Sequence, residues 1–176
     1  CAEISATGLM RSCEVSSDES CQISASYTEG HTTRTDTYDI TIREFVPPGE
    51  VIIDNGDAGT SSTWGLYVSI GANPYGDNSL YSMYWGARYT FEAALDGSYE
   101  VSLWWTELRS RCSSVPVEIY DGYTLVDTIE VNQKADDGQW NVLGTYVFSG
   151  IARVVIISEG GCSTCADAVR FVYSAW

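Results

Sequence analysis

The chain has 176 residues, of which 44% are hydrophobic and 12% aromatic, a composition that indicates a folded protein and excludes a disordered one. Its 24 acidic and 9 basic side chains give a net charge of −15, without the clustered Lys and Arg that nucleic acid or an anionic membrane surface requires. No run of 18 apolar residues occurs, so the sequence predicts no transmembrane segment.

Residues 1–45 form an arm that is rich in Ser and Thr. Its last part alternates apolar and polar residues through Tyr38, Ile40, Ile42 and Phe45, which offers apolar groups to a partner surface. We expect the arm to make ordered β contacts and to join chains by adding a strand to the sheet edge of a neighbour. Residues 46–50, VPPGE, are expected to be a linker, because paired prolines cannot continue a central strand.

Residues 51–176 are a series of short apolar runs with a period of two, separated by Asp-Gly and Gly-Gly turn signals, including Asp96-Gly97. Strands at this spacing, without a helical stretch, predict an all-β domain, an antiparallel β-sandwich of jelly-roll type. Val101, Leu103 and Trp105 should share one face of a strand, opposite Trp104. The expected core residues are Val101, Leu103, Ile119, Val131, Leu143, Val155, Ile157, Val169 and Phe171.

An ordered series of phrases lies in this part of the chain. It runs VIIDNGDAG, YTFEAALDGSYEVSLWWTE, VPVEIYDG, LVDTIEVNQ, GQWNVLGTYVF, ARVVIIS and CADAVRFVY. Residues 51–173 thereby resemble the golvesin C-terminal-like family, also called the xanthan-lyase carbohydrate-binding-like domain. The resemblance implies a non-catalytic β-sandwich module of a secreted or surface protein of a microbe, and it names no ligand.

Six cysteines in a chain of this kind predict disulfide bonds. The arm and the domain each hold an odd number, so full oxidation within one chain requires at least one bond between them; otherwise a cysteine joins a neighbouring chain or stays free. Short bonds Cys13–Cys21 and Cys162–Cys165 are plausible. The chain begins at Cys1 without Met, which predicts processing from a secreted precursor and leaves acylation of Cys1 as an alternative. The cysteines are Cys1, Cys13, Cys21, Cys112, Cys162 and Cys165.

The sequence offers few residues for catalysis or for binding a cofactor. His31 is the only histidine and no catalytic motif accompanies it, so we expect no enzyme and no cofactor. The acidic cluster at Asp54 and Asp57 is typical of a turn, although its oxygens could hold a structural calcium ion. Asp167, which matches an Asp in the closing motif of the family, could join them from another strand.

Aromatic residues are the remaining candidates for a binding site. Exposed rings can stack on the apolar faces of sugars, so Trp64, Tyr84, Trp85, Trp104 and Trp140 form a possible glycan platform. The alternative is that these rings pack the arm onto the domain, or one subunit onto the next.

Two functions from different classes fit these observations. The first is a secreted or cell-surface structural protein that assembles with copies of itself into a filament or sheath through its arm. The alternative is a carbohydrate-binding module that recognises extracellular polysaccharide. The arm and the odd cysteine numbers favour the first, whereas the family resemblance and the aromatic content favour the second.

Overall fold

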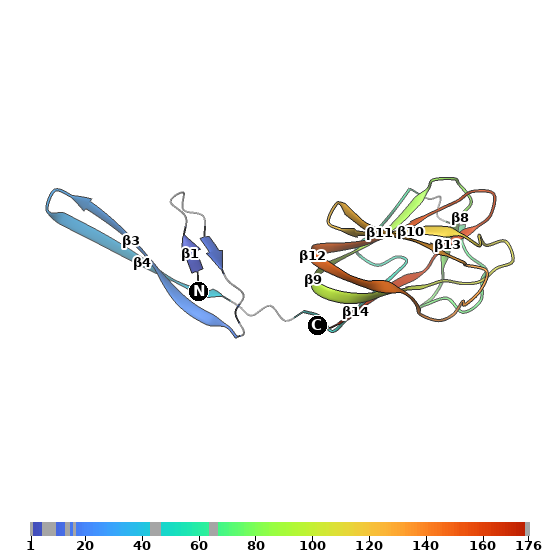
Figure 1. Cartoon of the computed structure of the whole chain (residues 1–176), viewed down its shortest axis with the longest axis horizontal. Coiled ribbons are helices and arrows are strands. Elements are labelled where there is room, and N and C mark those ends of the chain that lie inside the picture. Colours follow the sequence, from blue (N-terminus) through green and yellow to red (C-terminus); the bar gives the residue numbers. More distant parts are fainter. Residues whose placement is uncertain are drawn as a thin grey trace. The chain divides into compact units, whose positions relative to one another are not determined.

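The computed structural model describes residues 2–4, 10–12, 15, 17–42, 47–63 and 67–174 (Figure 1). It divides into two units, Cys1–Val46 and Pro47–Trp176. The predictions made for Cys1, Cys13, Phe45 and Trp64 lie outside the described residues. In the part of the chain described, no helix is long and apolar enough to span a membrane.

The described part of the first unit contains two antiparallel strand pairs. β1 (Ala2–Ile4) pairs with β2 (Met10–Ser12), and β3 (Glu19–Glu29) pairs with β4 (Thr32–Ile42). The β3–β4 hairpin turns at Gly30-His31, where Gly30 has a φ of +61° that favours glycine. Its alternation separates an apolar face, which places Ile23 opposite Tyr38, from a face of hydroxyl pairs such as Ser26–Thr35.

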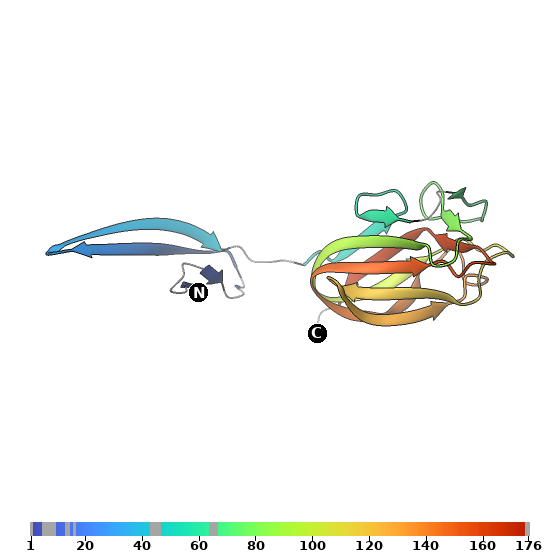
Figure 2. The same cartoon turned by 90° about the horizontal axis from the view of Figure 1, so that it is seen from above.

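The second unit is an antiparallel β-sandwich, as the period of two predicts (Figure 2). Its main sheet has the order β11-β10-β12-β9-β14-β5, with β6 also paired to β9, and a smaller sheet has the order β13-β8-β7. The strands are β5 (Glu50–Asp54), β6 (Thr60–Ser62), β7 (Tyr67–Val68), β8 (Leu80–Ser82), β9 (Arg88–Trp104), β10 (Val115–Asp121), β11 (Thr124–Val131), β12 (Asn141–Ile157), β13 (Thr164–Ala166) and β14 (Ala168–Tyr173).

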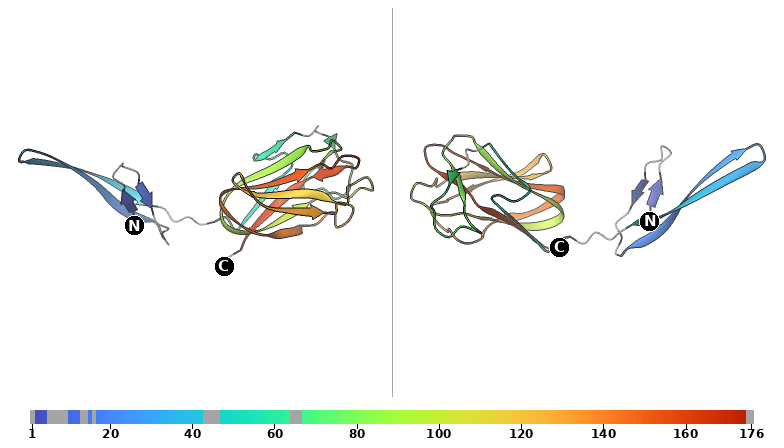
Figure 3. Two further views of the ribbon diagram at one scale, coloured as in Figure 1. Left: turned by 45° about the horizontal axis from the view of Figure 1, so that its top comes forward. Right: turned by 180° about the vertical axis from the view of Figure 1, so that it is seen from behind.

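The long pair β9–β12 runs through both layers of the sandwich, because the main sheet folds over along it (Figure 3). The first half of β9 pairs with β6 and its second half pairs with β14, while β12 also pairs with β10. The turn predicted at Asp96-Gly97 is wrong, because β9 runs through it. Gly97 and Gly150 have φ values of +117° and +141°, so these two strands cross the fold in a backbone conformation that side-chain-bearing residues rarely adopt.

The core lies on the inward face of these strands and largely follows the predicted alternation. Val101, Leu103 and Trp105 are buried together, and the ring of Trp104 lies on the other face. On β12, Val154 and Ile156 belong to the core cluster, whereas the predicted Val155 is buried on the opposite face and the predicted Ile157 is only half-buried. The expected core residues that the cluster contains are Val101, Leu103, Ile119, Val131, Val169 and Phe171, with Leu143 packed against it at partial burial.

One disulfide bond, Cys112–Cys162, closes a separation of 50 residues in the second unit. Cys112 N donates to Ser163 O, and this contact brings the two segments together. Cys165 is a free thiol, fully buried, and Cys21 is also free. The predicted bonds Cys162–Cys165 and Cys13–Cys21 are therefore wrong. The predicted bond between arm and domain is wrong too, since all three cysteines of the domain are accounted for.

Leu103→Ala should lower the free energy of unfolding of the domain by about 2–5 kcal/mol, because Leu103 is fully buried and its removal leaves a cavity. Leu125→Ala is the matched control: Leu125 is 50% exposed on β11, so its truncation should cost less than about 0.5 kcal/mol. Urea denaturation followed by tryptophan fluorescence measures both. Equal midpoints for the two variants would contradict the assignment of the core.

Replacing both Cys112 and Cys162 by Ser should destabilise the domain by about 4 kcal/mol, from the chain entropy released by a loop of this length. The measurement is the urea midpoint of the double variant under non-reducing conditions, beside Cys21→Ser as a control in the other unit. A double variant as stable as the parent would show that the bond does not form.

Candidate functional site

A groove lies on the outward face of the main sheet, opposite the core. Strand register places its floor in one row, in which Ser61 lies beside Thr90, Thr90 beside Val155, and Val155 beside Glu118. The next row sets Glu92 beside Arg153, and Arg153 beside Tyr120. Small side chains in the middle and long ones around them leave a hollow of about 390 Å³. It is lined by Ser61, Arg88, Thr90, Glu92, Tyr120, Tyr123, Arg153 and Val155.

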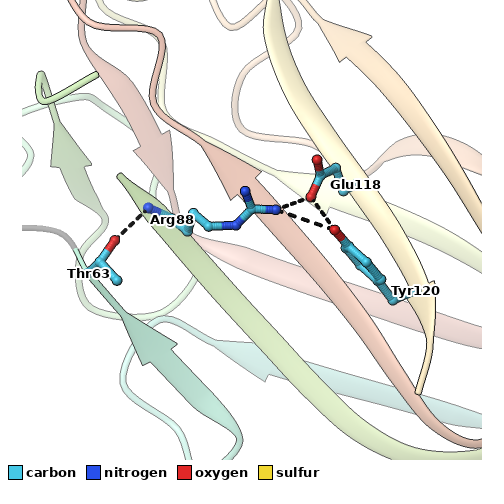
Figure 4. A network of polar contacts seen from close by, with 4 residues as sticks. All are labelled: Thr63, Arg88, Glu118 and Tyr120. Carbon is cyan, nitrogen blue, oxygen red and sulfur yellow. Dashed lines mark hydrogen bonds and ion pairs between the residues drawn. The ribbon is translucent and has the colours of Figure 1, made fainter. Parts of the chain in front are cut away.

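At one end of the groove, Arg88, Glu118 and Tyr120 form a polar network (Figure 4). Arg88 Nη2 makes an ion pair with Glu118 Oε2, and the Tyr120 hydroxyl donates to the same oxygen at 2.6 Å. The hydrogen bond to Glu118 raises the pKa of Tyr120, so the phenol stays a donor. The backbone N–H of Arg88 donates to Thr63 Oγ1 at 2.8 Å, which anchors the start of β9.

At the other end, Arg153 connects a carboxylate to an aromatic ring. Arg153 Nε donates to Glu92 Oε1 at 2.6 Å, and this bond raises the pKa of the guanidinium. Arg153 Nη1 donates to the carbonyl oxygen of Gly122, in the two-residue turn between β10 and β11. The guanidinium carbon lies 4.2 Å from the ring centroid of Tyr123, a cation–π contact. Tyr123 is 91% exposed, so the contact fixes a ring that is otherwise open to solvent.

These two ends give the groove the chemistry of a site for hydroxyl-rich molecules. A guanidinium offers five donors, and each of these two keeps donors that its carboxylate does not use. Among the described residues, the contacts of Glu118 run through Oε2, which leaves Oε1 as an acceptor. Donors and acceptors therefore lie side by side, next to an exposed aromatic ring.

Trp104 and Trp140, predicted as stacking residues, come together in a separate aromatic cluster with Tyr75. Their ring centroids lie 5.3 Å apart, and Tyr75 is 5.7 Å from Trp104 and 5.2 Å from Trp140. Trp104 Nε1 donates to Asn73 O at 3.0 Å, and the Arg170 guanidinium lies 4.9 Å from the ring centroid of Trp140. The rings thus pack on each other and hold the loop at Asn73 in place, and both Trp104 and Trp140 stay partly exposed.

Tyr84 and Trp85, also predicted as stacking residues, lie in the turn between β8 and β9 and are 60% and 83% exposed. Exposed Tyr67, Val68, Ile70 and Met83 belong to the same part of the domain. The turn is closed by Ala87 N donating to Tyr84 O at 3.2 Å. Among the described residues, the ring–ring contacts of Trp104 and Trp140 are with each other and with Tyr75, so Tyr84 and Trp85 are not members of that cluster.

The three acidic residues proposed for calcium have separate roles. Asp57 Oδ2 accepts from Asp54 N at 2.9 Å, which closes the turn after β5. Asp167 is fully buried, and its Oδ2 accepts from Tyr75 N at 3.3 Å, while its Oδ1 has no hydrogen-bond partner in the described part of the chain. No three His, Cys, Asp or Glu side chains among the described residues converge on a point that could hold a metal ion, so a calcium ion here would also need carbonyl or amide oxygens as ligands.

Sequence reasoning missed the residues of the groove because they look like the ordinary polar face of a strand. Arg88, Thr90 and Glu92 alternate with buried aromatics, as outward residues of a sandwich do. Only the register of β9, β12 and β10 brings them next to Arg153 and Glu118. The turn at Asp121-Gly122 was the one available signal, because it places Tyr123 at an exposed tip.

The sandwich is of the type that carbohydrate-binding modules adopt. A family 35 carbohydrate-binding module from an environmental isolate matches it with a TM-score of 0.53 at 12% identity, over 69% of this chain and 92% of that one. A β-(1,4)-mannanase of Podospora anserina matches with a TM-score of 0.52 at 15% identity, over 73% of this chain and 28% of that one. At these identities the likeness shows the fold alone.

The chain belongs to the Golvesin C-terminal domain family, which it matches over residues 51–173. It is similar to a xanthan lyase of Bacillus sp. (strain GL1), at 31% identity in an alignment of 145 residues that covers 72% of this chain and 16% of the lyase. The structure of a Paenibacillus xanthan lyase matches with a TM-score of 0.67 at 25% identity, over 84% of this chain and 15% of that one. The chain therefore spans about a sixth of these relatives.

Asp167→Asn should make the stability of the domain less sensitive to pH. Burial, and then the nearby Asp54 carboxylate, raise the pKa of Asp167 to about 8. A carboxyl group whose pKa is higher in the folded state stabilises the fold at low pH, and its contribution is lost as pH rises from about 4 to about 8. The variant should therefore gain stability over the parent across this range, measured by thermal unfolding from pH 4 to 9.

Asp96→Asn, at an exposed position on β9, is the control for that series and should follow the parent. If the difference in stability between the parent and Asp167→Asn does not change with pH, this result would contradict the raised pKa of Asp167. A melting temperature that rises with added Ca²⁺ in the parent but not in Asp167→Asn would instead identify Asp167 as a metal ligand.

Proposed function

We propose that the domain is a non-catalytic module that binds extracellular polysaccharide in the groove on its outward sheet face. The observation that carries this proposal is the groove itself. Its floor is made of small side chains, and its two ends each combine a guanidinium, a carboxylate and a phenol. Pockets of a few hundred Å³ with a small number of placed polar groups are typical of ligand sites.

Three further observations support this function. Family membership and the fold of the carbohydrate-binding modules favour glycan binding over the filament subunit that the arm suggested. Tyr123 is positioned to stack on the apolar face of a sugar ring, because Arg153 fixes it and leaves it exposed. The Cys112–Cys162 bond fits an oxidising compartment, as an extracellular or cell-surface protein requires.

Self-association through the arm is the second candidate, and one feature favours it. The β3–β4 hairpin carries Cys21, Ile23, Tyr27, Tyr38 and Ile40 on one face, with Tyr27 and Tyr38 both largely exposed. An isolated two-stranded hairpin is marginally stable in water, so a partner on this face would stabilise it. Deleting residues 1–45 should then convert an oligomer into a monomer in analytical ultracentrifugation. A monomeric full chain would rule this function out.

Tyr123→Ala should weaken polysaccharide binding about tenfold, which corresponds to about 1.4 kcal/mol, because the stacking ring is lost. The measurement is isothermal titration calorimetry or affinity electrophoresis of the full chain against a panel of soluble polysaccharides. Tyr123→Phe should retain binding, since it keeps the ring.

Leu125→Ala, at an exposed position just beyond the same turn, is the matched control and should leave binding unchanged. Trp85→Ala tests the other exposed aromatic surface. If Trp85→Ala loses binding while Tyr123→Ala binds fully, the polysaccharide site does not lie in the groove. A chain that binds no member of the panel would contradict the proposed function.

A further inference from the structure

The groove contains two similar clusters, and from them we infer the class of glycan that it takes. Arg88, Glu118 and Tyr120 lie at one end, and Arg153 and Glu92 lie with Tyr123 at the other. We propose that the groove binds a neutral polysaccharide chain rather than an acidic one. This inference rests on the proposed function, and it adds the charge of the ligand.

The two clusters adjoin each other. Tyr120 lies beside Arg153 in the register of β10 and β12, and its hydroxyl is 3.4 Å from Arg88 Nη2, which also contacts Glu118. The groove therefore presents one continuous set of two guanidinium groups and two carboxylates.

The charges of the groove favour a ligand without carboxylates. Each guanidinium already contacts a carboxylate, Arg88 with Glu118 and Arg153 with Glu92, so neither is a free cation. A sugar carboxylate would lie beside these two acidic side chains. Residues 51–176 also carry 15 acidic and 6 basic side chains, a net charge of −9 that repels a polyanion.

The hydrogen-bonding groups of the two clusters match neutral sugars instead. A sugar hydroxyl both donates and accepts, and neighbouring hydroxyls on a ring can use a guanidinium N–H and a carboxylate oxygen that lie side by side. The ion pairs hold these groups in place before binding, which reduces the side-chain entropy lost when the ligand binds.

The other arginines of the domain that lie near a cavity or an aromatic cluster do not supply an alternative anion site. Arg111 is fully buried, and its guanidinium donates to neutral partners, among them Thr106 O at 2.9 Å and Ser163 Oγ at 3.1 Å. Arg170 lies 3.9 Å from a carboxylate oxygen of Glu50 and stacks on Trp140. Both guanidinium groups therefore already make contacts within the domain.

The test compares glucan, mannan and galactan chains, each beside the same chain with its primary hydroxyls oxidised to carboxylates. At least one neutral chain should bind the full-length protein, and its oxidised counterpart should bind at least about tenfold more weakly at low salt. This difference in affinity should narrow in high salt, because screening weakens charge repulsion.

Tighter or equal binding of the oxidised chain would overturn the inference and leave the proposed function intact. Failure of every chain to bind would overturn both.

A charge-removing variant tests the inference from the side of the protein. Glu118→Gln removes a negative charge while it keeps the shape, so it should reduce the preference for the neutral chain at least about fivefold. Glu130→Gln, outside the groove on β11, is the matched control and should not change this preference. Unchanged preference in Glu118→Gln would overturn the inference.

Discussion

The pairing of β9 with β12 is the constraint on which the domain depends. These two strands of 17 residues each remain in register from Asn141↔Leu103 to Ile157↔Arg88, with one irregularity between Val142 and Gly144. Their outer partners differ along the length, so one continuous ladder belongs to both layers of the sandwich. Gly97 and Gly150 provide the backbone freedom that this path requires, and the side chains that face inward along it meet in a single core.

The same ladder places the groove. Because side chains alternate along a strand, burial of Tyr89 and Phe91 on one face forces Arg88, Thr90 and Glu92 onto the other. Register with β12 and β10 then sets Arg153 next to Glu92, and Tyr120 next to Arg153. The positions of the polar groups are therefore fixed by the packing of the core beneath them, which gives a binding surface on rigid strands rather than on loops.

Local patterns were sufficient to predict the sandwich and the faces of the strand at residues 101–105, whereas the arm pairs its own strands β3 and β4 in a hairpin that was not predicted. These patterns did not predict which face is buried where every residue of a run is apolar. The run Val154-Val155-Ile156-Ile157 is β-branched throughout, so alternation could not show which residues face the core. Asp96-Gly97 has the composition of a turn but serves as a bend within a strand. The disulfide Cys112–Cys162 joins segments that only the tertiary fold brings together.

The site was harder to predict than the fold, for a physical reason. Aromatic rings are conspicuous in a sequence, yet their use depends on what covers them. Trp104 and Trp140 contact each other edge to face, while Tyr123 stays exposed and contacts Arg153 on another strand. A cluster that arises from four strands has no local signature, because each contributing residue is an ordinary polar residue in its own segment.

The pairing of β5 with β14 also has a mechanical consequence. These strands are antiparallel, with Glu50 opposite Val172 and a hydrogen bond from Tyr173 N to Gly49 O at 2.9 Å, so the chain enters and leaves the domain at neighbouring points. Tension applied through the flanking chain would therefore open this pair one hydrogen bond after another, instead of shearing many bonds at once. Under load, the domain would yield first at this edge, while the β9–β12 ladder and the groove on it stay intact. A module with this geometry can be carried within a longer polypeptide without separating the segments on its two sides.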